Sequence, residues 1–212
     1  MTSFRKKSGS QHDPIVLGTH NKVSFDPLGE HFTVLIDSNE GKRIHFPEVM
    51  RWQPRGCRNS QVVTIASRVV NLGRLSHSRG DYSLDGYTHV TAVEKKGGIA
   101  ELAHNIKTGK LEQQLYNLRR LVRYPYLLLD FPLPKMYGTG GNAIFRENDP
   151  TPCALDRVFA VADKYQVPVL GPTTAETYTT RIMLGEYLIR RMLSHIKGET
   201  YVPYEDIQAA TK

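Results

Sequence analysis

Cysteine is scarce in this chain: 212 residues contain two, and Cys57 and Cys153 lie far apart. Neither belongs to a Cys-x-x-Cys pair or a Cys/His spacing that binds zinc, so the sequence predicts no disulfide framework and no zinc site. No apolar run approaches the length of a membrane span, about 18 residues or more. No apolar segment follows the basic start, as it would in a signal peptide. We therefore expect a soluble, intracellular protein with no membrane partner.

The charge balance is basic, with 28 Lys and Arg against 21 Asp and Glu and a formal net charge of +7. A charge of this sign favours a polyanionic partner such as nucleic acid. The length fits one well-buried domain. We expect a loosely ordered polar leader over residues 1–30, one domain over residues 31–198, and a C-terminal tail over residues 199–212.

This domain contains both short apolar runs, which are typical of buried strands, and segments of helical periodicity. The combination predicts an α/β fold. Strands are expected at residues 32–36, 42–46, 62–72, 88–94, 124–129 and 167–170, and a loop at 47–59. The strands of the first half are expected to form a largely antiparallel meander. Helices are expected around residues 99–106 and 111–122, and over residues 152–165 and 173–195.

Two carboxylates and a lysine stand out in the middle of the chain. Glu94 and Lys96 are two positions apart in an expected strand, so their side chains share a face. Asp81, at the end of the neighbouring strand, is expected to converge on them. Hard carboxylate oxygens suit Mg²⁺, with Mn²⁺ as a substitute, and an ammonium suits the phosphate that such a metal activates. The pattern predicts a metal-dependent phosphodiesterase.

Each of these residues has an expected role. Asp81 and Glu94 are expected to bind the metal directly, with the main-chain carbonyl of Lys95 as a third ligand. Lys96 is expected beside the scissile phosphate, where it would orient water or stabilise developing negative charge.

Other charged residues extend the hypothesis. Asp37 and Glu40 follow the first buried strand and are expected to complete an acidic rim or to hold a second metal. Arg119, Arg120 and Arg123 lie opposite the apolar stripe of their helix. They are candidates for salt-dependent contacts with DNA phosphates, and a merely solvated helix face remains open as the alternative.

The order Asp81, then Glu94-x-Lys96, is similar to the signature of the restriction-endonuclease-like, or PD-(D/E)xK, nucleases. The contexts Gly80-Asp81-Tyr82 and Val93-Glu94-Lys95-Lys96 resemble more closely the XPF family of structure-selective endonucleases, whose nuclease domain carries GD…ERKxxxD. Residues 36–40, 109–114 and 124–130 also resemble the first acidic strand of that family, its helix with a basic residue and a following glutamine, and its next strand.

The resemblance implies a single-domain restriction-endonuclease-like core with a central mixed β-sheet flanked by helices. It implies Mg²⁺-dependent hydrolysis of DNA, selective for branched, flap or junction substrates, and a homodimer. Lys95 would donate to phosphate and Glu101 would support the acidic cluster.

The sequence departs from the family pattern at three points. A three-residue gap after Lys96 leads to Ala100 rather than an acid, and a gap of four leads to Glu101. Asn39 stands where the family has arginine. No helix-hairpin-helix or helicase motif is present. Two other interpretations remain open: a non-catalytic DNA-binding or dimer-partner module on the same fold, and a sequence-specific restriction-type nuclease.

Overall fold

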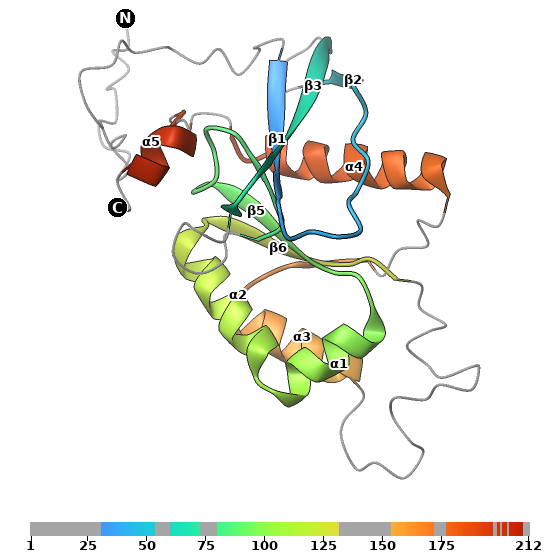
Figure 1. Ribbon diagram of the computed structural model, residues 1–212, viewed down its shortest axis with the longest axis vertical. Helices are drawn as coiled ribbons and strands as arrows, with labels where there is room; N and C mark the ends of the chain where they lie inside the picture. Colours follow the sequence, from blue (N-terminus) through green and yellow to red (C-terminus); the bar gives the residue numbers. More distant parts are fainter. Residues whose placement is uncertain are drawn as a thin grey trace, which may run out of the picture.

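A mixed sheet with the strand order β2-β3-β1-β4-β5-β6-β7 forms the centre of the described structure (Figure 1). The computed structural model describes residues 31–53, 60–72, 80–131, 154–171, 177–196, 199, 201–202 and 204–209. Its strands are β1 (His31–Asp37), β2 (Val49–Trp52), β3 (Gln61–Val70), β4 (Tyr82–Leu84), β5 (Thr91–Lys96), β6 (Tyr124–Leu129) and β7 (Val169–Leu170). Its helices are α1 (Ile99–Lys107), α2 (Lys110–Leu121), α3 (Ala154–Lys164), α4 (Tyr178–Leu193) and α5 (Tyr204–Ala209). The expected leader and the start of the helix at Pro152 lie outside the described residues.

Strand directions divide the sheet into two parts. β1, β4 and β5 pair antiparallel, and β5, β6 and β7 then run parallel to one another. β3 pairs parallel with β1 on its other side, and β2 closes that edge antiparallel to β3. The predicted antiparallel pairing is therefore confirmed for β1, β4 and β5, and it is wrong for β3, which runs parallel to β1. The α/β class and the central mixed sheet with flanking helices are confirmed, and the arrangement is consistent with a restriction-endonuclease-like core.

Two strand predictions in the first half are wrong. Residues 42–46 form no strand; Ile44 is buried, and its N–H donates to the Tyr82 hydroxyl at 3.1 Å instead of to a neighbouring strand. The strand β2 lies within the segment that was expected to loop. Met50 and Trp52 are buried there while the residues between and before them are exposed, which is the alternation of an edge strand with one face on the core.

Helices cover both faces of the sheet, with α4 on one side and α1, α2 and α3 on the other (Figure 1). The alternation along β6 shows why two cores form. Tyr126 and Leu128 belong to the cluster beneath α4, and Leu127 and Leu129 belong to the cluster beneath α1, α2 and α3. A strand buried on both faces reads as a continuous apolar run, as the sequence of β6 does. None of the helices in the described ranges is long and apolar enough to cross a lipid bilayer.

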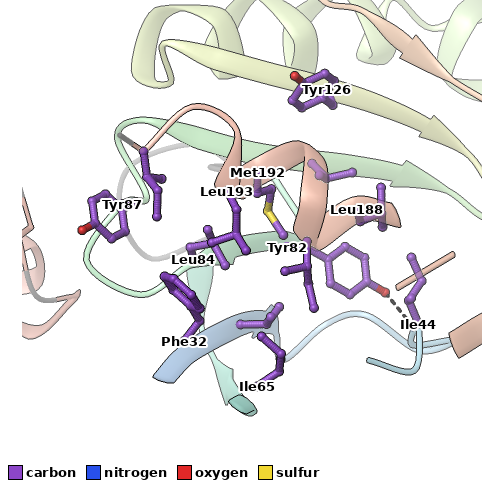
Figure 2. Packing of buried hydrophobic residues seen from close by; sticks show 14 of the residues in the cluster. Phe32, Ile44, Ile65, Tyr82, Leu84, Tyr87, Tyr126, Leu188, Met192 and Leu193 are labelled. Carbon is purple, nitrogen blue, oxygen red and sulfur yellow. Dashed lines mark hydrogen bonds between the residues drawn. The ribbon is translucent and has the colours of Figure 1, made fainter. Parts of the chain in front are cut away.

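The core beneath α4 fixes the segment that follows β1. Leu188, Met192 and Leu193 pack beside Tyr82, whose hydroxyl reaches Ile44 (Figure 2). α4 approaches this segment so closely that a Cβ atom at Gly185 would lie 2.1 Å from the carbonyl oxygen of His45. The absence of a side chain at Gly185 therefore sets the distance between the helix and the loop beside the candidate site.

Gly185→Ala is expected to lower the free energy of unfolding by about 1–3 kcal/mol, the usual cost of overpacking a filled core. Helix propensity alone would raise the free energy of unfolding, because alanine is a better helix former than glycine by about 1 kcal/mol. Met183→Ala, on the exposed side of the same helix, is the control and should change stability little. Urea unfolding of the two variants decides the question: a Gly185→Ala protein as stable as the wild type contradicts the close approach.

Candidate active site

Three consecutive charged residues end the central strand β5, and all three are buried. Glu94, Lys95 and Lys96 are 4%, 4% and 2% exposed. Charged side chains are almost never buried to this degree unless they are paired. Strand alternation places Glu94 and Lys96 on the face of α1 and α2, and Lys95 on the face of α4.

A glycine brings Asp81 beside Glu94. The Asp81 N–H donates to the carbonyl of Val93, the residue that pairs with Tyr82, so Asp81 lies beside the Val93–Glu94 segment of β5 where the regular pairing of β4 ends. Gly80 has φ of +78°, and a Cβ atom there would lie 2.7 Å from the Val93 carbonyl oxygen. A larger residue would push the two segments apart, so Gly80 allows Asp81 to approach β5 closely enough for the charge of Glu94 to act on it.

Hydrogen bonds engage one oxygen of each carboxylate and leave the other oxygen available. Asp81 Oδ2 accepts from the main-chain N–H of Lys95 at 2.6 Å. Glu94 Oε1 accepts from Lys96 Nζ at 2.8 Å and from Gln114 Nε2 at 2.9 Å. Asp81 Oδ1 and Glu94 Oε2 have no hydrogen-bond partner among the described residues. These two oxygens are the available ligand atoms of the site.

The electrostatics of the pair favour a bound cation. Burial, followed by the neighbouring charge of Glu94, raises the pKa of Asp81 to about 8. Burial alone would lower the pKa of Lys96, but the adjacent Glu94 more than offsets this, and the Lys96 pKa is raised. Lys96 thus remains an ammonium, and it faces two carboxyl groups, of which Asp81 is the one whose ionisation is opposed.

The donor set fits Mg²⁺. In the described part of the chain, no group of three or more His, Cys, Asp or Glu side chains is arranged to hold a metal ion. Mg²⁺ is usually bound through one or two carboxylates, with waters and substrate phosphates completing its shell. Asp81 and Glu94 match that mode, in which the substrate supplies part of the coordination.

The Lys95 side chain lies on the other face of the sheet. Its Nζ pairs with Glu40 Oε1 at 2.9 Å and lies 3.9 Å from Asp130 Oδ2. Asp130 in turn pairs with Arg181 of α4 at 3.1 Å. We call these four residues the buried ion network. The structure therefore does not bring the Lys95 ammonium to the face of Asp81 and Glu94, and only its main-chain N–H reaches Asp81.

The remaining acidic candidates take different positions. Asp37 shapes the turn after β1, because its Oδ1 accepts from the Asn39 N–H at 3.2 Å and from the Asn39 side chain at 3.4 Å. Glu40 lies near enough to Asp81 to raise its pKa further, although its Oε1 is engaged by Lys95.

Glu101 lies on the rim of the site. It is half-exposed, and its Oε1 is 3.4 Å from Lys96 Nζ. Glu101 thus presents a carboxylate to Lys96, and its place in the family motif stays a prediction.

The three arginines lie at the other end of the sheet. Arg119, Arg120 and Arg123 are exposed where α2 ends and β6 begins, and in the register of the sheet Tyr124 pairs with Thr91 rather than with Glu94. Arg119 donates to the Arg123 carbonyl, and Arg123 pairs with Glu199. The structure does not bring these side chains to the carboxylate pair.

Gln114, Asp130 and Arg181 contact the site residues but were not among the predicted site residues. Gln114 lies on the stripe of α2 that also carries the buried Leu111, Leu115 and Leu118, and Arg181 lies on the buried stripe of α4. A polar residue within the apolar face of an amphipathic helix is the signal that could have found both. Asp130 directly follows the apolar run of β6.

Comparisons with known proteins give little further identification. No family model matches the chain, and no curated protein matches it. Among solved structures, the chain is similar to XPF from Aeropyrum pernix, with 16% sequence identity and a TM-score of 0.46. That likeness covers 81% of this chain and 66% of the other. A likeness of this degree carries no argument about activity, so the function has to be argued from the site.

Arg181→Met is expected to lower the free energy of unfolding by about 3–5 kcal/mol, because it leaves Asp130 buried with an incomplete set of partners. Arg190→Met removes the exposed pair with Glu186 on the same helix and should cost less than about 1 kcal/mol. Chemical denaturation of both proteins checks the contrast, and equal losses would show that the buried ion network contributes no more than a surface pair.

Asp81→Asn is expected to stabilise the metal-free protein at pH 7 by at least about 1 kcal/mol, close to the free energy of one unit of pKa. At pH 7 a carboxyl group with a pKa of about 8 is largely protonated in the folded protein but ionised in the unfolded chain, so folding must take up a proton. Asparagine removes that cost, and its side-chain oxygen can still accept from the Lys95 N–H. The same variant should lose any thermal stabilisation by Mg²⁺.

Asp85→Asn is the matched control for Asp81→Asn. Asp85 follows the other end of β4 and pairs with Arg68 at 3.1 Å, so its neutralisation should destabilise the protein. Thermal unfolding in EDTA and in Mg²⁺ measures both variants. A lower melting temperature for Asp81→Asn in EDTA would contradict the raised pKa of Asp81.

Proposed function

We propose that this protein is a Mg²⁺-dependent endodeoxyribonuclease that hydrolyses phosphodiester bonds in branched, flap or junction DNA. The observation that carries the proposal is the close approach of the half-buried Asp81 to the buried Glu94, with one oxygen of each carboxyl group unpartnered among the described residues. Lys96 provides a positive charge on the same face. Two carboxylates and an ammonium on one surface are suited to phosphoryl chemistry with a divalent metal.

Each residue of the site would have its own role in the reaction. Asp81 Oδ1 and Glu94 Oε2 would hold the metal, with the main-chain carbonyl of Lys95 as a further ligand. Bound there, Mg²⁺ would lower the pKa of a water nucleophile and neutralise phosphate charge. Lys96, kept protonated by Glu94, would stabilise the negative charge that develops on the phosphate.

DNA as the substrate is supported by the net charge of +7 and by the resemblance of the motif to the XPF family. Selectivity for branched DNA and assembly as a homodimer are proposed on that resemblance alone. Arg119, Arg120 and Arg123 would contact DNA away from the scissile bond, because they lie at the other end of the sheet.

The proposal predicts cleavage of flap, fork or junction DNA in Mg²⁺ or Mn²⁺ and none in EDTA. Asp81→Ala and Lys96→Ala should lower cleavage by at least about a hundredfold, in the range expected when an electrostatic contact to the transition state is lost. Both variants should still bind the same DNA, because phosphate contacts elsewhere dominate affinity. Gel-based cleavage and binding assays on matched substrates measure the two properties.

Asp163→Ala, at an exposed carboxylate on α3, is the control and should cut as the wild type does. A wild-type protein that binds DNA and cuts none of these substrates with any divalent metal is a binding or partner module instead. Cutting at fixed positions in linear duplex would identify a sequence-specific nuclease, and cutting of the same structures made of RNA would show that the substrate is not limited to DNA.

A further inference from the structure

We propose that Gln114 positions the metal site. Its side-chain nitrogen would hold Glu94, and its side-chain oxygen would accept a hydrogen bond from a water that completes the shell of the divalent cation. The inference rests on the proposed function and assigns to this glutamine the part of the site that the carboxylates do not supply.

The first observation is the hydrogen bond between α2 and β5. Gln114 Nε2 donates to Glu94 Oε1 at 2.9 Å, the same oxygen that accepts from Lys96 Nζ. An ionised carboxylate only accepts hydrogen bonds, so the amide must direct its nitrogen to Glu94 and its oxygen elsewhere. With both donors on Oε1, Glu94 is held with Oε2 available for the metal.

The second observation concerns the amide oxygen. Gln114 Oε1 is buried and has no hydrogen-bond partner in the described structure. Buried acceptors of this kind are rare in folded proteins, because leaving one unpaired costs free energy. The amide oxygen and nitrogen share one carbon, so Oε1 lies in the region next to the Glu94 carboxylate.

A water of the metal shell satisfies this oxygen. Mg²⁺ gives up its waters reluctantly and keeps several of them when it binds protein carboxylates. Such waters are strong donors and need acceptors around them. Groups that hold the ligands and waters of a metal site commonly set its affinity, and their loss weakens it by about 10–100-fold.

The chain offers a matched control one residue away. Gln113 is exposed on the same helix, and its amide donates to Asn117 at 3.2 Å. Gln113 has the same side chain in the same helix, but among the described residues the α2 amide that bonds Glu94 is that of Gln114. A change common to both positions therefore reports on the helix, and a change limited to Gln114 reports on the site.

The experiment compares Gln114→Met with Gln113→Met by calorimetric titration of metal-free protein with Mn²⁺ and by thermal unfolding in EDTA. Methionine is similar in size and removes both the donor and the acceptor. We expect Gln114→Met to bind Mn²⁺ about 10–100-fold more weakly than wild type, and Gln113→Met to bind as the wild type does. In EDTA the melting temperature of Gln114→Met should stay close to that of wild type, because losing the hydrogen bond to Glu94 and removing the unpartnered oxygen change stability in opposite directions.

Each other result overturns the inference in its own way. Unchanged Mn²⁺ affinity in Gln114→Met shows that the amide does not serve the metal, whether or not the protein cuts DNA. A lower melting temperature in EDTA with unchanged affinity assigns Gln114 to packing. A wild-type protein that neither binds Mn²⁺ nor cuts DNA removes the proposed function itself, and the inference with it.

Discussion

The burial of Glu94, Lys95 and Lys96 at the end of the central strand is the constraint on which the rest of the described structure depends. Three charged side chains in succession cannot lose their water unless each meets a partner of the opposite charge or a hydrogen-bond donor. The residue just before β4 and helix α2 supply groups on one face, and the turn after β1, the residue after β6 and helix α4 supply them on the other. Most elements of the described fold therefore contribute a residue that contacts the end of β5.

The two faces of β5 meet this constraint in different ways. On the α4 face, Lys95 and Arg181 contribute two positive charges against the carboxylates of Glu40 and Asp130, so the charges balance. On the α2 face, one ammonium at Lys96 meets the carboxylates of Asp81 and Glu94, and the pKa of Asp81 rises. Strongly raised pKa values such as that of Asp81 are found more often at functional sites than elsewhere. The difference between the two faces is the reason for placing the proposed site on the α2 face.

The sequence predicted the parts of the fold that local periodicity decides. The apolar run of β6, the amphipathic pattern of α2 and the adjacency of the strands that carry Asp81 and Glu94 are all as expected. The place of β3 was not predictable in this way, since a strand rich in β-branched residues pairs equally well in either direction. The segment at residues 42–46 has strand-like composition, but Ile44 meets the Tyr82 hydroxyl and packs beneath α4, a long-range contact that no local pattern contains.

The same limit applies to the site. Spacing in a strand brought Glu94 and Lys96 to one face, but the same alternation turns Lys95 away from them, so its expected phosphate contact does not follow from the motif alone. Its main-chain N–H nevertheless holds Asp81 while its side chain joins the buried ion network. One residue thus ties the carboxylate pair on the α2 face to Asp130 and Arg181 on the α4 face. Arg181 also donates to the Arg43 carbonyl. The position of α4 and of the loop beside it therefore influences the position of Lys95, and through the Lys95 N–H the position of Asp81. Neither element contributes a carboxylate to the pair.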